Sequence, residues 1–547
     1  MLSAQENHGG GDQVYLRPEV KMEPLICGWY AWSHLIAPAQ LALHITYRIL
    51  PLMQSFVANP AVHIAASSDP KMYGGPFMSL GEQDIAQVKQ LIERTKLDCA
   101  SLIQFAQDLK ALDAMLQDKA TGYSLNEYYA SLPPSLQGLV ELLYDINHRP
   151  NIRLFEGLMY ADRMTDAVQE MRISLERDAD RHFFMSTPRL AQKGTLIKKM
   201  RFDDPRLDRL AAMRVQAASF RDIASAFDIA EADLPDFREF FTSAAPRRNG
   251  EAGYGGEQVR MRYFGHACVL FQTADTAVLF DPFVSTEHGP DQRYTIADLP
   301  DFIDYVVLTH SHQDHFNAEM LIQLRSRIGR IIVPTSNSGN IADPAIKQTL
   351  LELGFERIDV LDAFDEVALP EGKIVSLPFT GEHADLSIYS KQAIALTLKG
   401  NKFMFLIDSD GRDAVLYRRL MRLIGPVDAL FIGMECHGAP LTWLYEPLLG
   451  KPVNRRNNES RRLSGADCAR AQNILDEVKA ARVFVYAMGQ EPWMKFIMGL
   501  EYEPDSIQLV ESTRFVEQCN SQGTPAERLY CSKEVLFPPK AAARHGG

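Results

Sequence analysis

The strongest constraint on the fold is a run of metal-binding side chains that directly follows an apolar segment. Residues 305–308 are apolar and include two valines, which predicts a buried strand. Histidines and an aspartate follow at once, at His310, His312, Asp314 and His315. Extended backbone places His310 and His312 on the same side, so both rings can bind one metal ion. The chain then turns toward a helix, which lets Asp314 and His315 reach a second ion.

Two later segments offer further ligands, each at the end of an apolar strand. Asp408 ends one such strand and is well placed to bridge both ions, whereas Asp410 lies one step further into the turn. After the strand at 373–378 the candidates are Glu382 and His383, and their spacing does not separate them. Side chains from separate strand ends therefore predict a dinuclear metal site.

The chain beyond residue 258 alternates short β-branched runs with helical stretches. Strands that come first in runs and then alternate with helices fit two stacked sheets with helices outside. We therefore expect an α/β fold, an αββα sandwich, over residues 258–515. The predicted strands are 259–264, 268–272, 277–280, 305–308, 330–333, 373–378, 393–399, 402–407, 429–432 and 482–487, and a helix is predicted at 318–327.

The N-terminal half has a different pattern, in which apolar residues recur every three or four positions. This spacing is typical of helices that bury one face, so residues 14–243 are expected to form a mainly helical domain. Residues 1–13 are polar and glycine-rich and are expected to be disordered; 244–257 predict a linker, and 516–547 a C-terminal extension. The clearest helical stripes are Ile85, Val88 and Ile92, and then Leu102, Phe105, Leu109, Leu112 and Leu116.

Composition disfavours nucleic acid and membrane as partners. The chain of 547 residues has a net charge of −13, and a duplex-binding surface is usually basic. Residues 219–241 resemble a helix-turn-helix, but in an acidic chain a structural or partner-docking role is favoured. The apolar stretch 25–50 is interrupted by Pro38 and Arg48, which disfavours a membrane-spanning helix there. Seven scattered cysteines and no signal-peptide pattern predict a reducing, cytoplasmic location.

Several further residues near strand ends are weaker candidates. His266 could orient a ligand or only pack in the core, and Asp281 could hydrogen-bond a ligand histidine or a loop amide. Glu435 or His437 could complete the second ion or line a pocket. Glu491 could replace a histidine ligand late in the chain. Aromatic residues that could wall a substrate channel, or belong to the core, are Trp443, Tyr445 and Trp493.

The motifs Gly265-His266, Asp281-Pro282, the His310–His315 run and Asp408 resemble the metallo-β-lactamase superfamily over about half the chain. Hydrolases of that superfamily also place a histidine on a late strand. The matching stretch here, residues 483–493, contains none. This departure disfavours the main competing function, a dizinc hydrolase of a thioester or phosphodiester.

The closer resemblance is to the dinuclear iron β-hydroxylases of nonribosomal peptide pathways, of the chloramphenicol-biosynthesis type, and it covers nearly the whole chain. In that family a glutamate replaces the hydrolase histidine. The resemblance implies that Glu382 joins His310 and His312 at one iron and that Asp408 bridges to the second. Asp314 and His315 would bind that second iron. Glu382 and Asp408 are then the expected catalytic ligands.

The resemblance also implies the reaction. Two iron ions, oxo- or hydroxo-bridged when oxidised, would use O₂ and external electrons to hydroxylate the β-carbon of an amino acid. That amino acid would be held as a thioester on a carrier (thiolation) domain of a nonribosomal peptide synthetase. Carboxylate oxygens suit redox-active iron better than zinc. The N-terminal domain would serve a homodimer or the docking of the carrier.

Two more functions, besides the dizinc hydrolase, are compatible with these residues. A flavodiiron-type oxygen or nitric oxide reductase shares the sandwich, but it usually carries a flavin module that the motifs do not indicate. A non-catalytic scaffold would tolerate loss of His310. The hydroxylated amino acid, whether aromatic or aliphatic, does not follow from the residues.

Overall fold

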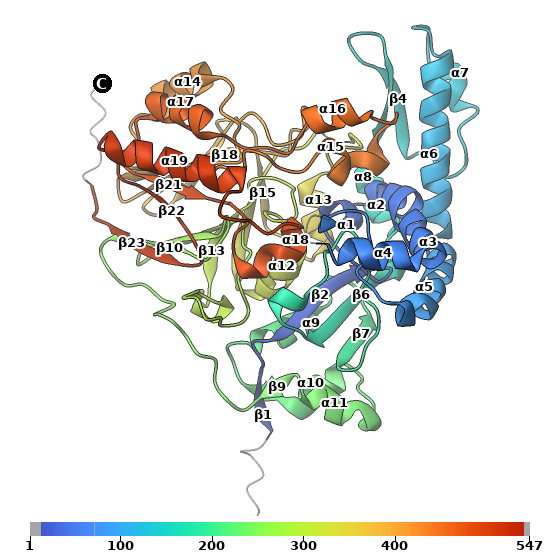
Figure 1. Cartoon of the computed structure of the whole chain (residues 1–547), viewed down its shortest axis with the longest axis horizontal. Helices are drawn as coiled ribbons and strands as arrows, with labels where there is room; N and C mark the ends of the chain where they lie inside the picture. The colour runs from blue at the N-terminus through green and yellow to red at the C-terminus, as the bar shows by residue number, and fades with distance from the viewer. Residues whose placement is uncertain (1–11, 70–71, 338, 541–547) are drawn as a thin grey trace, which may run out of the picture.

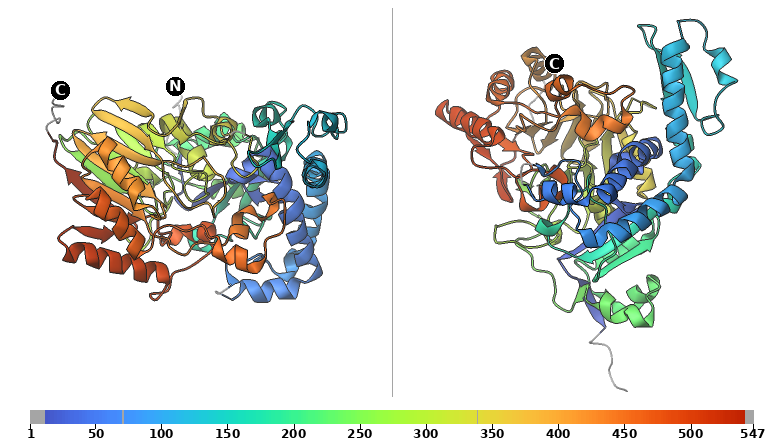
Figure 2. Two further views of the ribbon diagram at one scale, coloured as in Figure 1. Left: turned by 90° about the horizontal axis from the view of Figure 1, so that it is seen from above. Right: turned by 45° about the vertical axis from the view of Figure 1, so that its right-hand side comes forward.

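The computed structural model describes residues 12–69, 72–337 and 339–540. Figure 1 shows the N-terminal region, coloured blue to green, packed beside two sheets and their helices, coloured green to red. The view from above shows the two sheets lying face to face (Figure 2). The predicted α/β sandwich with a helix-containing N-terminal region is therefore confirmed.

Each sheet of the sandwich has seven strands. In order, the first is β15 (Ile358–Leu361), β14 (Ile328–Pro334), β13 (Ile303–Val307), β12 (Ala277–Phe280), β11 (Val269–Gln272), β10 (Val259–Tyr263) and β23 (Lys533–Phe537). The second is β16 (Glu366–Leu369), β17 (Gly372–Leu377), β18 (Ala393–Leu398), β19 (Asn401–Ile407), β20 (Ala429–Gly433), β21 (Val483–Tyr486) and β22 (Ala526–Arg528). All ten predicted strands are present, with ends shifted by up to two residues.

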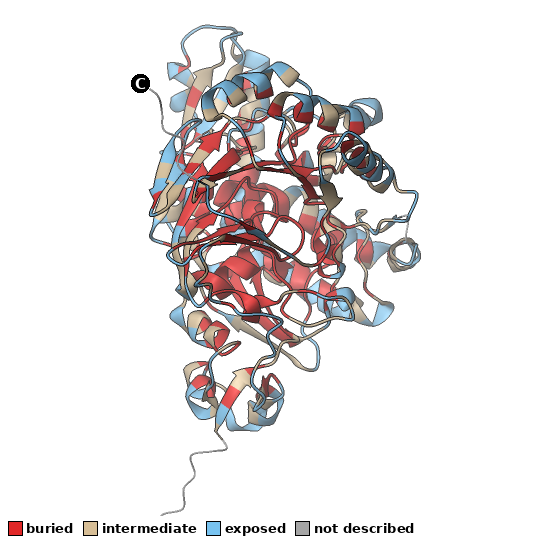
Figure 3. Cartoon of the chain, turned by 90° about the vertical axis from the view of Figure 1, so that its left-hand side faces the viewer, coloured by how far each residue is buried: buried red, intermediate tan, exposed pale blue. Residues whose placement is uncertain are grey.

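Aromatic side chains fill the space between the sheets. Phe405 of the second sheet stacks on Phe280 of the first, with ring centroids 4.0 Å apart, and on Phe431 at 4.5 Å. Figure 3 shows this interior as continuously buried. Burial of both sheet faces explains why these strands read as uninterrupted apolar runs. The outer faces are covered by helices that include α12 (Ala318–Leu324), α14 (Ala414–Ile424), α17 (Cys468–Val478) and α19 (Ile507–Ser521).

The expectation of a C-terminal extension over 516–547 is wrong for the residues that the structure describes. Helix α19 continues to Ser521, β22 pairs with β21, and β23 pairs with β10, so this segment closes one edge of both sheets. Edge strands are short, half-exposed and charged, which makes them look like surface loops in sequence. Residues 541–547 lie outside the described residues.

The N-terminal region contains the expected helices and, in addition, a sheet that was not expected. Helices α5 (Ile85–Asp98) and α6 (Ala100–Lys119) carry the two predicted apolar stripes, and the stripe of α6 is buried. Beside them lies a four-stranded antiparallel sheet, and the hairpin of β4 (Val140–Tyr144) and β5 (Pro150–Leu154) projects with the end of α6 (Figure 2). The order of the four strands is β3 (Trp29–Tyr30), β2 (Val20–Ile26), β6 (Gln169–Leu175) and β7 (Thr195–Lys199).

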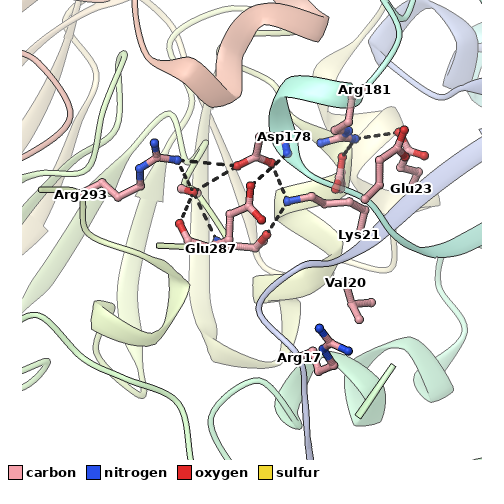
Figure 4. A network of polar contacts seen from close by, with 12 residues as sticks. Arg17, Val20, Lys21, Glu23, Asp178, Arg181, Glu287 and Arg293 are labelled. Carbon is pink, nitrogen blue, oxygen red and sulfur yellow. Dashed lines mark hydrogen bonds and ion pairs between the residues drawn. The ribbon is translucent and has the colours of Figure 1, made fainter. Parts of the chain in front are cut away.

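A buried ion network explains why β2 was missed. Its residue Glu23 is fully buried and pairs with Arg172, Arg181 and Arg189 at 2.5–2.9 Å. Charged residues on the inner face interrupt the apolar alternation by which a strand is recognised. Figure 4 shows Glu23 beside Arg181, next to the contacts of Lys21, Asp178 and Arg293. Arg181 also pairs with Glu319 of α12 at 2.5 Å, so the network joins the N-terminal region to the sandwich.

The remaining segments were predicted in part. Residues 219–241 contain α10 (Phe220–Ala226) and α11 (Leu234–Arg238), packed beside the small sheet of β8 (Ala218–Ser219), β1 (Gln13–Leu16) and β9 (Phe241–Thr242). Of residues 1–13, which are expected to be disordered, 1–11 lie outside the described residues, whereas Gln13 begins β1. Residues 243–258 contain no helix or strand.

The fold also bears on the membrane and cysteine expectations. Within the described residues no single helix is long and apolar enough to cross a membrane, although one pair of helices, bent by 105° between Pro38–Ala58 and Pro60–Ser67, passes on length and composition. All seven cysteines are free, and six are buried.

Candidate metal centre

The predicted ligands gather at one edge of the sandwich, where strands of both sheets end. The His310–His315 run follows β13, Glu382 follows β17, and Asp408 follows β19 directly. Strands β13 and β19 lie in different sheets, so stacking of the sheets brings their carboxyl ends together. All six side chains are buried.

One group of ligand atoms is formed by His310, His312 and Glu382. Their atoms lie within 4.8 Å of one another, close enough to surround a single ion. Nδ1 of His312 is 2.7 Å from Oε1 of Glu382. Two imidazoles and a carboxylate on one side of an ion, with open positions opposite, are typical of iron sites that react with dioxygen.

A second group is formed around His315, and Asp408 lies between the two groups. Oδ2 of Asp408 is 3.1 Å from Nε2 of His315 and 3.6 Å from Nε2 of His310. Oδ2 of Asp314 is 3.4 Å from the same atom of His315. A single oxygen of Asp408 thus faces a histidine from each group, which is the position of a bridging ligand.

Asp281 and Thr309 orient two of the histidine rings by accepting hydrogen bonds from them. Nδ1 of His315 donates to Oδ2 of Asp281 at 2.9 Å. The Thr309 hydroxyl donates to the same oxygen at 2.6 Å, so it accepts from Nδ1 of His310 at 3.1 Å. Both Nε2 atoms then carry free lone pairs, as metal binding requires. Asp281 therefore accepts hydrogen bonds from a histidine and also, at 2.8 Å, from the backbone amide of Thr309.

His266 orients Asp314. The amide of Gly489 donates to Nδ1 of His266 at 3.1 Å, which leaves the proton of the neutral ring on Nε2. That nitrogen lies 3.1 Å from Oδ2 of Asp314 and donates to it. A ring nitrogen that carries a proton cannot bind a metal, so His266 supports a ligand instead of acting as one.

The geometry also separates Glu382 from His383. Glu382 belongs to the first ligand group, whereas Nδ1 of His383 lies 3.0 Å from the Tyr445 hydroxyl. The same hydroxyl is 3.1 Å from Nε2 of His312. When His312 binds metal through Nδ1, its Nε2–H donates to Tyr445, which in turn donates to His383. Tyr445, a channel or core candidate in the sequence, is therefore a hydrogen-bond bridge.

Two cations fit the charges and the free lone pairs of this site. The Nε2 atoms of His310 and His315 are buried, and neither has a hydrogen-bond partner among the described residues. Burial lowers the pKa of His310 well below its usual value and so keeps the ring neutral. Burial, together with the negative charges of Asp408 and Asp314, raises the pKa of Glu382 well above the ordinary carboxyl range. Bound cations would relieve this repulsion.

A cavity of about 390 Å³ lies beside the ligands, and residues from both parts of the protein line it. Glu382 and Asp314 lie on its wall, as do Met72 and Gly75 of the N-terminal region. Among the candidates, Glu435, His437 and Trp443 also line it. Burial and the neighbouring carboxylate of Glu382 raise the pKa of Glu435. His437 is exposed and lies outside the ligand groups found among the described residues.

The other late candidates do not reach the site. Glu491 accepts a hydrogen bond from the Tyr263 hydroxyl at 2.5 Å and belongs to none of the ligand groups found in the described part of the chain. It therefore does not replace the missing histidine. The ring of Trp493 is buried and lies 4.7 Å from the guanidinium of Arg293, as a core residue does.

Contacts from the N-terminal region were missed entirely by sequence analysis. Ser33 donates to the backbone carbonyl of Ser311, inside the histidine run, at 2.7 Å. The Tyr30 hydroxyl accepts from Asn317 at 3.2 Å and donates to Glu319 at 3.1 Å. These partners lie more than 275 residues apart, and no local pattern predicts such contacts. The N-terminal region thus supports the loop that carries the ligands.

Comparisons with known proteins cover both parts of the chain. The model of a diiron non-heme β-hydroxylase N-terminal domain matches residues 15–246, and that of a β-lactamase superfamily domain matches residues 260–412. A metal-dependent hydrolase of Opitutus terrae is 26% identical over 222 residues, which is 38% of this chain and 88% of the hydrolase.

Similarity over nearly the whole chain is found with a curated hydroxylase. The 4-amino-L-phenylalanyl-[CmlP-peptidyl-carrier-protein] 3-hydroxylase of Streptomyces venezuelae is 34% identical over 528 residues, covering 95% of this chain and 99% of the relative. The crystal structure of CmlA, a diiron β-hydroxylase from Streptomyces venezuelae, matches with a TM-score of 0.89 at 32% identity and covers 96% of this chain and all of that chain.

Proposed function

Because the chain belongs to the family of diiron non-heme β-hydroxylases, we propose that it hydroxylates the β-carbon of an amino acid tethered to a carrier domain of a nonribosomal peptide synthetase. The predicted enzyme class and the diiron cofactor follow from the family. The tethered substrate is supported by the name of the Streptomyces venezuelae relative, which acts on an aminoacyl peptidyl carrier protein. The observation that supports oxygenation over hydrolysis is the carboxylate of Glu382 beside His312, 2.7 Å apart.

We assign the ligands from the two groups of atoms. His310, His312 and Glu382 would hold one iron, and Asp314 and His315 the other, with Asp408 between them. When bound, the two irons supply the redox chemistry that O₂ activation needs. Glu382 and Asp408 contribute hard, negatively charged oxygens, which favour higher oxidation states of iron.

The protein's own groups hold the ligands and shape the pocket. Asp281 and Thr309 fix the protons on Nδ1 of His315 and His310, and His266 fixes Asp314. Such supporting bonds typically change metal affinity or activity by about 10- to 100-fold. Electrons would come from an external donor.

The N-terminal region is proposed to dock the carrier and to form a homodimer. The end of α6 and the hairpin of β4 and β5 project from the rest of the molecule (Figure 2). Large apolar side chains next to these elements are exposed, with Tyr123 82% and Ile146 94% exposed. Exposed apolar side chains of this size favour a protein partner. Analytical ultracentrifugation of the wild type and of Ile146→Lys tests the dimer: a wild-type dimer that the substitution weakens supports it, and a wild-type monomer contradicts it.

The proposed reaction is tested by mass spectrometry of carrier domains loaded with a panel of aromatic and aliphatic amino acids. The reduced, iron-loaded enzyme should add the mass of one oxygen atom to one of them, and fragmentation should place it at the β-carbon. Glu382→Gln, which keeps the size of the side chain but removes its charge, serves as the matched control and should give no product. Release of the free amino acid without added oxygen would instead indicate a thioesterase.

A further inference from the structure

A second cavity, of about 770 Å³, adjoins the pocket at the metal centre. The two cavities share wall residues Gly74, Gly75, Pro440 and Trp443. At their boundary the indole Nε1 of Trp443 donates to the carbonyl of Gly74 at 3.0 Å. This hydrogen bond joins the N-terminal region to the sandwich where the cavities meet.

The second cavity leads from the surface inward. Pro51, Ser55 and Val62, on helices α3 (Leu50–Ala58) and α4 (Pro60–Ser67), are exposed, and Val62 is 57% exposed. The opposite wall has the buried side chains of Phe183 and Met185. The cavity is therefore a mainly apolar passage that begins at α3 and α4 and ends beside the metal pocket.

A π-helical turn places a cation on this passage. Helix α3 is the last part of a helical run that continues without a break from Pro38 to Ala58. Near its start, Pro51 lacks the backbone N–H that would donate the next α-helical hydrogen bond. The preceding turn, η1 (Ile45–Ile49), is π-helical, a local irregularity often found at functional sites. It presents Tyr47 and Arg48 to the passage.

Arg48 is half-buried, and it has no ion-pair partner among the residues that the structure describes. Its Nη2 donates to the carbonyl of Thr442 at 2.9 Å, whereas Nη1 is buried and has no partner among the described residues. Burial lowers the pKa of Arg48 to about 10, so the side chain stays charged at neutral pH. Glu446 is close enough to oppose this shift, but it forms no ion pair with Arg48 in the described residues. A half-buried guanidinium that lacks an ion-pair partner favours an anionic ligand.

We infer that this passage binds the phosphopantetheine arm of the carrier domain, with Arg48 binding its phosphate. The arm has a phosphate at the carrier end, apolar and amide groups along its length, and the thioester at its tip. The cavity offers a partner for each of these groups, in the cation of Arg48, the apolar walls and the adjoining metal pocket. The inference rests on the proposed carrier-tethered substrate.

The test uses two probes that differ only in phosphate, S-methyl phosphopantetheine and S-methyl pantetheine, because the methyl cap prevents a thiol from binding iron. Isothermal titration of the iron-loaded full-length enzyme should show about 10- to 100-fold tighter binding of the phosphorylated probe. Arg48→Gln keeps a donor for Thr442 and should abolish the difference, whereas Arg48→Lys should retain part of it. Arg514→Gln, at a side chain 70% exposed on α19, is the matched control and should behave as wild type.

Three results would overturn the inference. They are equal binding of the two probes to the wild type, an unchanged preference in a folded Arg48→Gln variant, and displacement of the probe by equimolar inorganic phosphate. Melting temperatures establish that each variant is folded. Failure of the proposed hydroxylation is distinguishable, because no loaded carrier would gain oxygen even if the arm binds. Conversely, Arg48→Gln could hydroxylate a loaded carrier with the same KM as the wild type. That result would exclude the role of the passage and leave the proposed hydroxylation standing.

Discussion

Asp281 accepts a hydrogen bond from Nδ1 of His315 at 2.9 Å, and this bond leaves Nε2 of the ring facing Asp408. The other oxygen of Asp281 accepts from the Thr309 amide. In Asp281→Asn the amide oxygen must stay with Thr309, so the NH₂ group faces His315. The ring then accepts at Nδ1 and carries its proton on Nε2, where metal binding needs a lone pair.

We therefore predict that Asp281→Asn weakens iron binding at the His315 site by about 10- to 100-fold, with the other site retained. Iron titration of the apoprotein with a competing chelator measures this change. Asp301→Asn, at a side chain 79% exposed, is the control and should bind as wild type. Unchanged iron affinity in Asp281→Asn would show that Asp281 does not fix the ring.

Gly381 sets the position of Glu382. Its φ is +104°, and a β-carbon there would lie 2.6 Å from Cβ and Cγ of Asp410. We predict that Gly381→Ala shifts the loop and lowers iron binding at the His312 site, because Glu382 is the next residue. Gly253→Ala, where no atom lies within 4 Å of the added carbon, is the control. Full iron occupancy in Gly381→Ala, measured by metal analysis, would contradict this account of the loop.

Glu23 stabilises the junction between the two parts of the protein. It compensates three buried arginines, Arg172, Arg181 and Arg189. Removing one partner of a buried ion network typically costs about 3–5 kcal/mol. We predict a loss of this size for Glu23→Gln in denaturant unfolding followed by fluorescence. Glu366→Gln, in an exposed pair with Lys373, should cost no more than about 1 kcal/mol.

The same residue predicts a dependence of stability on pH. Burial alone would raise the pKa of Glu23, but the charges of Arg189, Arg181 and Arg172 outweigh it and hold the pKa well below the ordinary value. The stabilisation is then fully present above the unfolded carboxyl pKa of about 4.3 and is lost as pH falls through the folded pKa. Melting temperatures between pH 7 and pH 3 should fall less steeply below pH 4.3 in Glu23→Gln than in the wild type. Parallel curves would contradict this assignment.

Local patterns were sufficient to predict the sandwich and most of the candidate ligands that the structure brings together. Buried strands of β-branched and apolar residues are visible as short runs, and the His310–His315 run and Asp408 directly follow two of them. The choice between Glu382 and His383 was different. Both lie in an irregular loop where Glu382, Ala384 and Asp385 have positive φ values, so no regular spacing relates side chain to direction.

What the sequence did not show depends on contacts between distant segments. Ser33 reaches the carbonyl of Ser311, and Tyr445 joins His312 to His383, yet each is an ordinary residue within its own segment. Strand β2 was hidden because ion pairs, not apolar side chains, fill one side of it. Such features become visible only when the chain is folded.

Six side chains from three strand ends are proposed to hold two iron ions. The most direct test of this claim is metal analysis, with Mössbauer spectroscopy, of protein produced in medium that contains both iron and zinc. We predict about two irons per chain, with the spectrum of a coupled pair, and loss of that pair in His310→Ala. Protein that contains zinc alone, or a single isolated iron, would contradict the claim.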